Sequence, residues 1–264
     1  MIKKIFFFLL FFSTQSLALE LSGKFIQGGL IVGKSEKKEK VFVDGKKIKI
    51  NKDGYFIFGI PRDRESSFVI ISKINGKEKK IIKKIKKRKY KIQKISGLPK
   101  RKVTPSDKDM IRIKKESKLI ALAKNKDTDL NFFFKEFLIP VKGVKTGVYG
   151  SQRILNGKPR RPHYGVDIAA NRGTEIKSSN SGKIVLAEEN FFFNGSTIII
   201  DHGHGLVTVY SHLDKIFVKK NQLVNKGHVI GTVGSTGRAS GPHLHFGMYC
   251  RNVPADPDLV FSLN

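Results

Sequence analysis

The sequence predicts a mainly β protein with a small N-terminal β domain, a linker helix and a C-terminal compact antiparallel β domain. Short apolar runs separated by Asp-Gly and Asn-Gly turns predict the first domain. A central segment with helical apolar spacing predicts the linker, and strands with glycine turns recur from Leu130 onward. The 264 residues are enough for two modest domains, and a hydrophobic content of 39% allows a buried core.

Residues 1–18 have the layout of a secretory signal peptide. Lys3 and Lys4 precede an unbroken apolar run, and the segment ends in small residues at the positions where signal peptidase cuts. A membrane anchor is the alternative, but a span needs about 20 apolar residues and this run is shorter. We therefore expect cleavage after Ala18 and export of the mature chain.

Residues 19–98 read as a chain of short strands. Asp44-Gly45 separates two apolar runs, at 41–43 and 48–50, and Asn75-Gly76 separates two more. Such dipeptides favour two-residue hairpins because both central positions need a positive φ. We expect an antiparallel β domain, and the segment carries no recognisable set of catalytic residues.

The positive charge is concentrated in residues 73–102. The whole chain has a formal charge of +29, and this Lys-rich segment holds 13 Lys and 2 Arg against one acid. A solvated, lysine-coated edge strand that resists aggregation would explain it. A grip on an anionic wall polymer or membrane surface is the functional alternative. Nucleic acid is not expected as a partner, because isoleucine rather than aromatic residues separates the lysines.

Residues 99–130 predict a linker helix, ahead of a C-terminal domain at 131–264. Thr104 can cap the first turn, with Pro105 inside it, and the helix should run to about Ala123. Met110, Ile113, Leu119 and Leu122 recur at roughly helical spacing. This spacing predicts a helix packed on a domain.

Histidine and carboxylate must provide any metal site, because Cys250 is the only cysteine. His163 and Asp167 are four residues apart, and His243 and His245 are two apart. On extended strands each pair would share one face. A catalytic zinc takes three protein ligands and keeps one open position, so two imidazoles and a carboxylate suffice. With His212, two further histidines remain for proton transfer and for stabilising an oxyanion.

The remaining candidates have structural interpretations. His202 and His204 lie in a glycine turn and are expected to be structural or solvent-facing, with His204 a weaker candidate for the rim of the groove. Cys250 is expected to be a small buried hydrophobe. Tyr210 precedes His212 by two and is a candidate for shaping the groove on the same face.

From about Val141 to Pro257 the chain resembles the lysostaphin/LytM-like family of zinc endopeptidases, in its Gram-negative branch. The resemblance rests on the His-Tyr-Gly-Val-Asp run from His163, the Tyr-Ser-His run that ends at His212, and the Gly-Pro-His-Leu-His-Phe run with His243 and His245. It implies one Zn²⁺ per chain, with ligands at His163, Asp167 and His245. It also implies catalytic roles for His212 and His243.

The resemblance implies hydrolysis of peptide cross-links in peptidoglycan, most naturally a D,D bond in the periplasm. Two other classes stay open. Some relatives lack the zinc ligands and act as non-catalytic activators of cell-wall amidases, whereas this chain keeps all five residues. A cationic protein that binds wall or membrane through its lysines is the other. The sequence does not indicate the oligomeric state.

Overall fold

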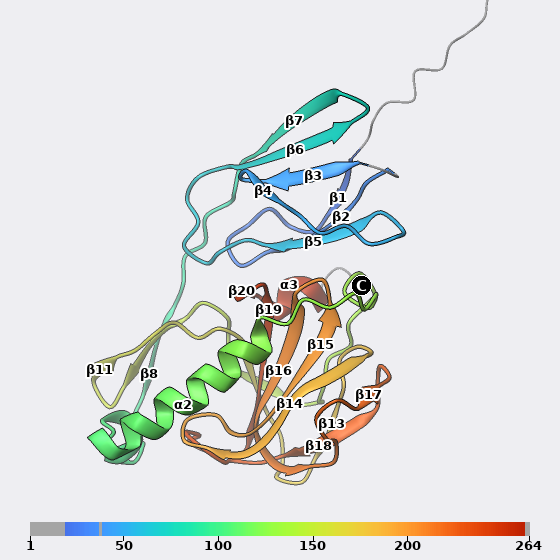
Figure 1. The fold of residues 1–264 in the computed structure, drawn as a ribbon. Helices are drawn as coiled ribbons and strands as arrows, with labels where there is room; N and C mark the ends of the chain where they lie inside the picture. The colour runs from blue at the N-terminus through green and yellow to red at the C-terminus, as the bar shows by residue number, and fades with distance from the viewer. Residues whose placement is uncertain (1–18, 37–38, 262–264) are drawn as a thin grey trace, which may run out of the picture.

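The computed structural model describes residues 19–36 and 39–261, so the predicted signal peptide lies outside the described residues. The chain forms two small N-terminal sheets above a larger β structure, with one long helix lying across the latter (Figure 1). The expected mainly β fold, with a small N-terminal β region and a helix, is confirmed. Among the described residues, no helix is both long and apolar enough to cross a membrane.

The N-terminal sheets pair in the orders β1-β2-β5 and β4-β3-β6-β7. Two predicted turns are confirmed, because Asp44-Gly45 joins β3 to β4 and Asn75-Gly76 joins β6 to β7, with positive φ throughout. The strand expected at 48–50 is wrong: β4 covers only Lys46–Lys47. The strands are β1 (Glu20–Ser22), β2 (Leu30–Lys34), β3 (Lys40–Val43), β4 (Lys46–Lys47), β5 (Tyr55–Gly59), β6 (Phe68–Ile74) and β7 (Lys77–Lys83).

The segment after β7 is called the linker below. It contains β8 (Ile92–Ile95), which was expected in the N-terminal domain, a short helix α1 (Lys100–Val103) and the long helix α2 (Asp107–Lys124). The expected cap at Thr104 is wrong. Ser106 caps α2 and accepts from the Asp109 backbone N–H, while the Asp109 side chain accepts from the Ser106 N–H. This reciprocal capping box leaves Pro105 before the helix rather than inside its first turn.

Helix α2 covers one face of the large sheet, against β14 and β15. Ile113 and Ala123 are buried there, as expected for a helix packed on a domain. Met110, Leu119 and Leu122 are exposed instead, so the expected apolar stripe forms only in part.

The C-terminal part is built on one large, mostly antiparallel sheet. Its main path runs β17-β14-β15-β16-β19-β12-β9, and its inner face holds the largest apolar core. The strands are β9 (Val144–Gly147), β12 (Val166–Ala169), β13 (Glu175–Lys177), β14 (Gly182–Phe191), β15 (Gly195–Gly203), β16 (Leu206–Ile216), β17 (Leu223–Val224), β18 (Val229–Val233), β19 (His243–Cys250) and β20 (Val253–Ala255), followed by helix α3 (Pro257–Phe261).

A separate small sheet links the linker to the C-terminal part. β10 (Gln152–Leu155) pairs in parallel with β8 and antiparallel with β11 (Lys158–Pro159). The register sets Gln152 opposite Ile92 and Leu155 opposite Ile95. Residues of the linker therefore lie directly beside the segment that leads into His163.

Candidate metal centre

Three side chains converge where β12 and β19 pair. The register places Asp167 directly opposite His245, so both point to the same face of the sheet. Asp167 Oδ1 lies 2.9 Å from His245 Nδ1 and 3.0 Å from His163 Nε2. The three ligand atoms all lie within 4.8 Å of one another, so one small cation between them would contact all three.

His163 reaches this position from outside the strand. The expectation that His163 and Asp167 share one strand is wrong, because β12 begins only at Val166 and the chain bends at Gly165. The His163 backbone N–H donates to Ser151 O at 2.9 Å, and its ring Nδ1 lies 3.1 Å from Val148 O. A carbonyl can only accept, so Nδ1 carries the proton and Nε2 keeps its lone pair for a cation.

Two glycines allow the close approach of the ligands. A Cβ added at Gly147 would lie 2.4 Å from Asp167 Oδ2, and one at Gly165 would lie 2.9 Å from His245 Cε1. Both contacts are shorter than real Cβ atoms show, so neither position has room for a side chain. Sequence reasoning missed both residues, although Gly165 lies inside the motif that begins at His163.

Asp167 is buried yet charged. Burial alone would raise the pKa of its carboxyl, but the close contacts with the His163 and His245 rings hold it well below its usual range. Its other oxygen, Oδ2, accepts from the Arg153 guanidinium of β10. The sequence analysis did not assign Arg153 a role, although it lies in the segment that leads into Pro162.

His212 and His243 lie beside the ligand set with their rings 4.8 Å apart between centroids. His212 Nδ1 lies 2.8 Å from Thr236 O, and His243 Nδ1 lies 2.9 Å from Gly241 O. Both rings therefore donate from Nδ1, and neither uses Nε2 for these contacts. Burial, followed by repulsion from His243 and His245, lowers the pKa of His212 to about 3, so its ring is neutral at neutral pH.

A β-bulge brings His212 to this face. Ile198 pairs with Tyr210 and Ser196 pairs with Leu213, so two residues of β16 face one residue of β15. His212 takes a φ of 68° in this bulge. Without the extra residue, alternation would have pointed its ring into the core.

The same bulge overturns the expectation for Tyr210. Tyr210 is fully buried, its ring lies 5.2 Å from that of Phe246, and its hydroxyl accepts from the Ser179 N–H. It lies on the opposite face from His212 and shapes the core rather than a groove.

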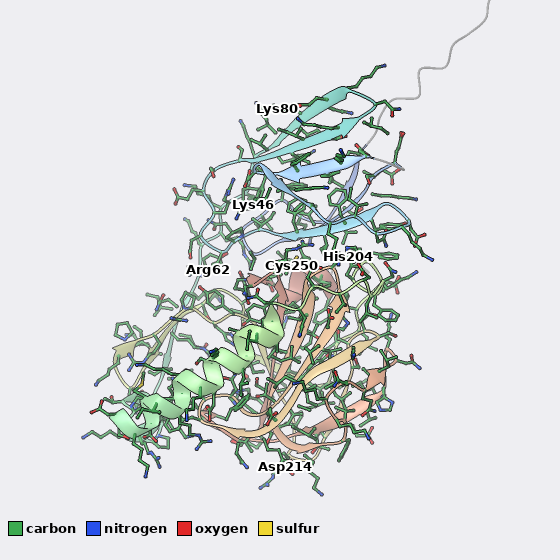
Figure 2. All side chains as sticks on the ribbon, viewed as in Figure 1. Lys46, Arg62, Lys80, His204, Asp214 and Cys250 are labelled. Carbon is green, nitrogen blue, oxygen red and sulfur yellow. The ribbon has the colours of Figure 1, made fainter. Side chains whose placement is uncertain are left out.

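Two further histidines, His202 and His204, are structural. His202 is buried and its two ring nitrogens contact Ser181 O and Thr208 Oγ1, at 2.7 and 2.8 Å. His204 is also buried, packed on Phe133, so a solvent-facing position is wrong for both. Figure 2 shows His204 and Cys250 at the boundary between the N-terminal sheets and the large sheet. Cys250 is buried, as expected.

Two cavities meet at this centre. The β8-side cavity, of about 130 Å³, is lined by Asp167 and His243 and, across from them, by Gln93, Ile95 and Leu98 of the linker. The α2-side cavity, of about 570 Å³, is lined by His163 and His245 together with residues of α2. Four residues line both: Arg153, Leu155, His212 and Arg238. A bound chain could therefore pass the three ligands with β8 on one side and α2 on the other.

An antiparallel β sheet that brings two histidines and an aspartate together beside two further imidazoles is the kind of arrangement that holds a catalytic metal. Residues 161–257 match Peptidase family M23. This stretch is therefore similar to M23 peptidases, and the family resemblance expected from the motifs is confirmed for it.

Named relatives match a little more than a third of the chain. The peptidoglycan DD-endopeptidase ShyB of Vibrio cholerae is 43% identical over 95 residues, which cover 36% of this chain and 22% of ShyB. The DD-carboxypeptidase/endopeptidase Mpg of Neisseria meningitidis is 39% identical over 97 residues, 37% of this chain and 22% of Mpg. The matched region is thus about a fifth of the length of these curated relatives.

One solved structure matches nearly the whole chain. It comes from Pseudomonas aeruginosa and is described as a candidate M23 peptidase. It is 26% identical, covers 89% of this chain and 94% of its own, and has a TM-score of 0.68. The likeness therefore extends to the N-terminal sheets and linker, beyond the residues that the family match covers.

Proposed function

We propose that this protein is a zinc-dependent endopeptidase that hydrolyses peptide cross-links in peptidoglycan, most naturally D,D bonds in the periplasm. The convergence of His163, Asp167 and His245 beside two further imidazoles carries the proposal. The names of ShyB and Mpg, each of which matches about a third of this chain, support the substrate class.

The donor set fits zinc. Two imidazole nitrogens and one carboxylate oxygen are a standard set for a catalytic zinc, and no thiolate is needed. His163 is already locked in the tautomer that offers Nε2, and Arg153 fixes the outer oxygen of Asp167. Zinc held by these residues would polarise a carbonyl and lower the pKa of water.

The chain's own groups supply the proton chemistry. His212 and His243 each use Nδ1 for a backbone carbonyl, so Nε2 is the atom through which either ring can act as a general base. After taking a proton, the same ring can donate it to the departing amine or to a developing oxyanion.

The test separates ligands from catalysts in the mature chain, residues 19–264. Replacing His163, Asp167 or His245 with Ala should remove zinc and activity together, because two ligands do not hold a catalytic zinc. Replacing His212 or His243 should leave the zinc but lower turnover by about 10²–10⁴-fold. Elemental analysis and mass spectrometry of muropeptides released from sacculi provide the two measurements. The division of roles is refuted if His243→Ala loses zinc as fully as His245→Ala.

A non-catalytic amidase activator is the competing proposal, and the complete ligand set does not favour it. The chelator experiment distinguishes the two. An enzyme should release cross-linked peptides as monomers, stop in chelator and recover with stoichiometric zinc. An activator would release nothing alone and would stimulate an added amidase with or without chelator.

A further inference from the structure

The α2-side cavity is strongly cationic. Four arginines line it, Arg153, Arg160, Arg161 and Arg238, and its described lining includes no aspartate or glutamate. Arg160 is already engaged, because it donates to Pro159 O and Val103 O. The excess of positive charge therefore faces whatever occupies this cavity, next to the metal centre.

The guanidinium N–H groups of Arg238 are available to a ligand. Its guanidinium carbon lies 4.2 Å above the ring of Phe193, which fixes the plane of the group. Within the described part of the chain its side chain makes no hydrogen bond or ion pair. Burial, with repulsion from Arg153 and Arg160, lowers the pKa of Arg238 to about 10. A cation held half-buried among like charges would gain from an added anion.

Arg153 is also only partly satisfied. One terminal nitrogen donates to Asp167 Oδ2, but Nε is buried and no group among the described residues accepts from it. A buried donor without a partner is costly, so a missing acceptor is expected nearby. Each of the two arginines, Arg153 and Arg238, lines both the β8-side cavity and the α2-side cavity.

We propose that Arg153 and Arg238 bind a free carboxylate of the substrate, that of the residue whose amine forms the scissile amide. This rests on the proposed endopeptidase function and names its substrate class: a peptide bond to a D-residue with an unblocked α-carboxylate. The carbon of that carboxylate is two bonds from the scissile nitrogen. Arg153 donates directly to Asp167, one of the proposed metal ligands, so it lies close to where the scissile bond would be. Paired guanidinium groups match the geometry of a carboxylate.

A purely structural role for the arginines predicts a different result. If Arg153 only orients Asp167 and Arg238 only stacks on Phe193, their loss would slow all substrates equally. Binding of a carboxylate would instead make the loss depend on that one group of the substrate.

The test compares two synthetic cross-linked dimers that differ only in having a carboxylate or a carboxamide on the amine-side residue. The zinc-loaded mature protein should prefer the carboxylate in kcat/KM by about 10–100-fold, the range for hydrogen bonds to charged groups. Arg238→Gln should bring that preference to within about threefold of unity and should keep its zinc. Arg238→Lys should keep only part of the preference for the carboxylate dimer, because an ammonium group cannot form the bidentate contact that a guanidinium group forms.

Arg64→Gln is the matched control. Arg64 also stacks on a phenylalanine, Phe68, at 4.3 Å, but it lines neither cavity, so its variant should keep the full preference. The proposal is overturned if Arg238→Gln retains the preference or slows both dimers equally, or if the wild type cleaves both dimers equally well.

Cleavage of neither dimer by the zinc-loaded wild type would instead refute the proposed function. Calorimetry with the metal-free protein still tests the arginines in that event. The carboxylate dimer should bind the wild type about tenfold more tightly than it binds Arg238→Gln, and equal affinities would overturn the carboxylate site.

Discussion

Replacing Gly147 with alanine should weaken the metal centre without disturbing the fold. Gly147 has no positive φ, so alanine suits its backbone, and the only serious contact is with the Asp167 side chain. The new Cβ would lie 2.4 Å from Oδ2, and ordinary contact begins at 3.4 Å, so the carboxylate must move by about 1 Å. Metal–ligand distances tolerate only about 0.2 Å.

The expected loss of zinc affinity is about 10–100-fold, the range found when groups that orient a ligand are lost. That corresponds to about 1.4–2.8 kcal/mol. Competition with a chromophoric chelator measures the affinity, and thermal unfolding in chelator checks the fold. Gly241→Ala is the control, since its Cβ would meet nothing within 4 Å. Zinc affinity in Gly147→Ala equal to wild type would refute the reasoning.

Three further predictions follow from other parts of the fold. Burial lowers the pKa of His202 to about 4, so the unfolded state binds one more proton than the folded state below pH 6.5. This group should therefore lower the free energy of unfolding of the metal-free protein by about 3 kcal/mol between pH 6.5 and 4, as measured by urea unfolding. A flat profile would contradict the prediction. Ser106→Ala should cost about 1 kcal/mol in thermal unfolding, because the capping box of α2 is lost; no change would show that the cap is unimportant. Changing six exposed lysines of residues 77–89 to glutamine should reduce retention on sacculi at low salt, because fewer positive charges attract the anionic polymer. Cleavage of a small soluble dimer should be unchanged. Slower cleavage would place that part of the Lys-rich segment in contact with the substrate at the metal centre.

The convergence of His163, Asp167 and His245 could be predicted because short motifs contain these residues, whereas the residues around them could not be predicted. His243 and His245 share a strand face, as their spacing indicates. His163 reaches Asp167 through a bend, and His212 reaches the centre through a bulge, and neither feature has a periodic signal. The glycines and arginines of the site act through contacts between distant segments, which spacing along the chain does not encode.

The Lys-rich segment shows the same limit. Its charge predicts a single surface feature, but the structure divides it (Figures 1 and 2). Lys80 lies on β7, far from the metal centre, whereas Gln93 and Ile95 of β8 line the β8-side cavity. Charge alone could not reveal that the end of the segment pairs with β10 and forms a wall of the cavity.

Contacts between segments that are distant in the sequence, such as β8 with β10, can form only after both segments have been synthesised. Ile92 leaves the ribosome 60 residues ahead of its partner Gln152, and Asp167 leaves 78 residues ahead of His245. At about 5–20 residues per second, the segment that is synthesised first has no partner for several seconds. The set of His163, Asp167 and His245 is incomplete throughout that interval, so the proposed metal centre cannot form until the chain has been almost entirely synthesised.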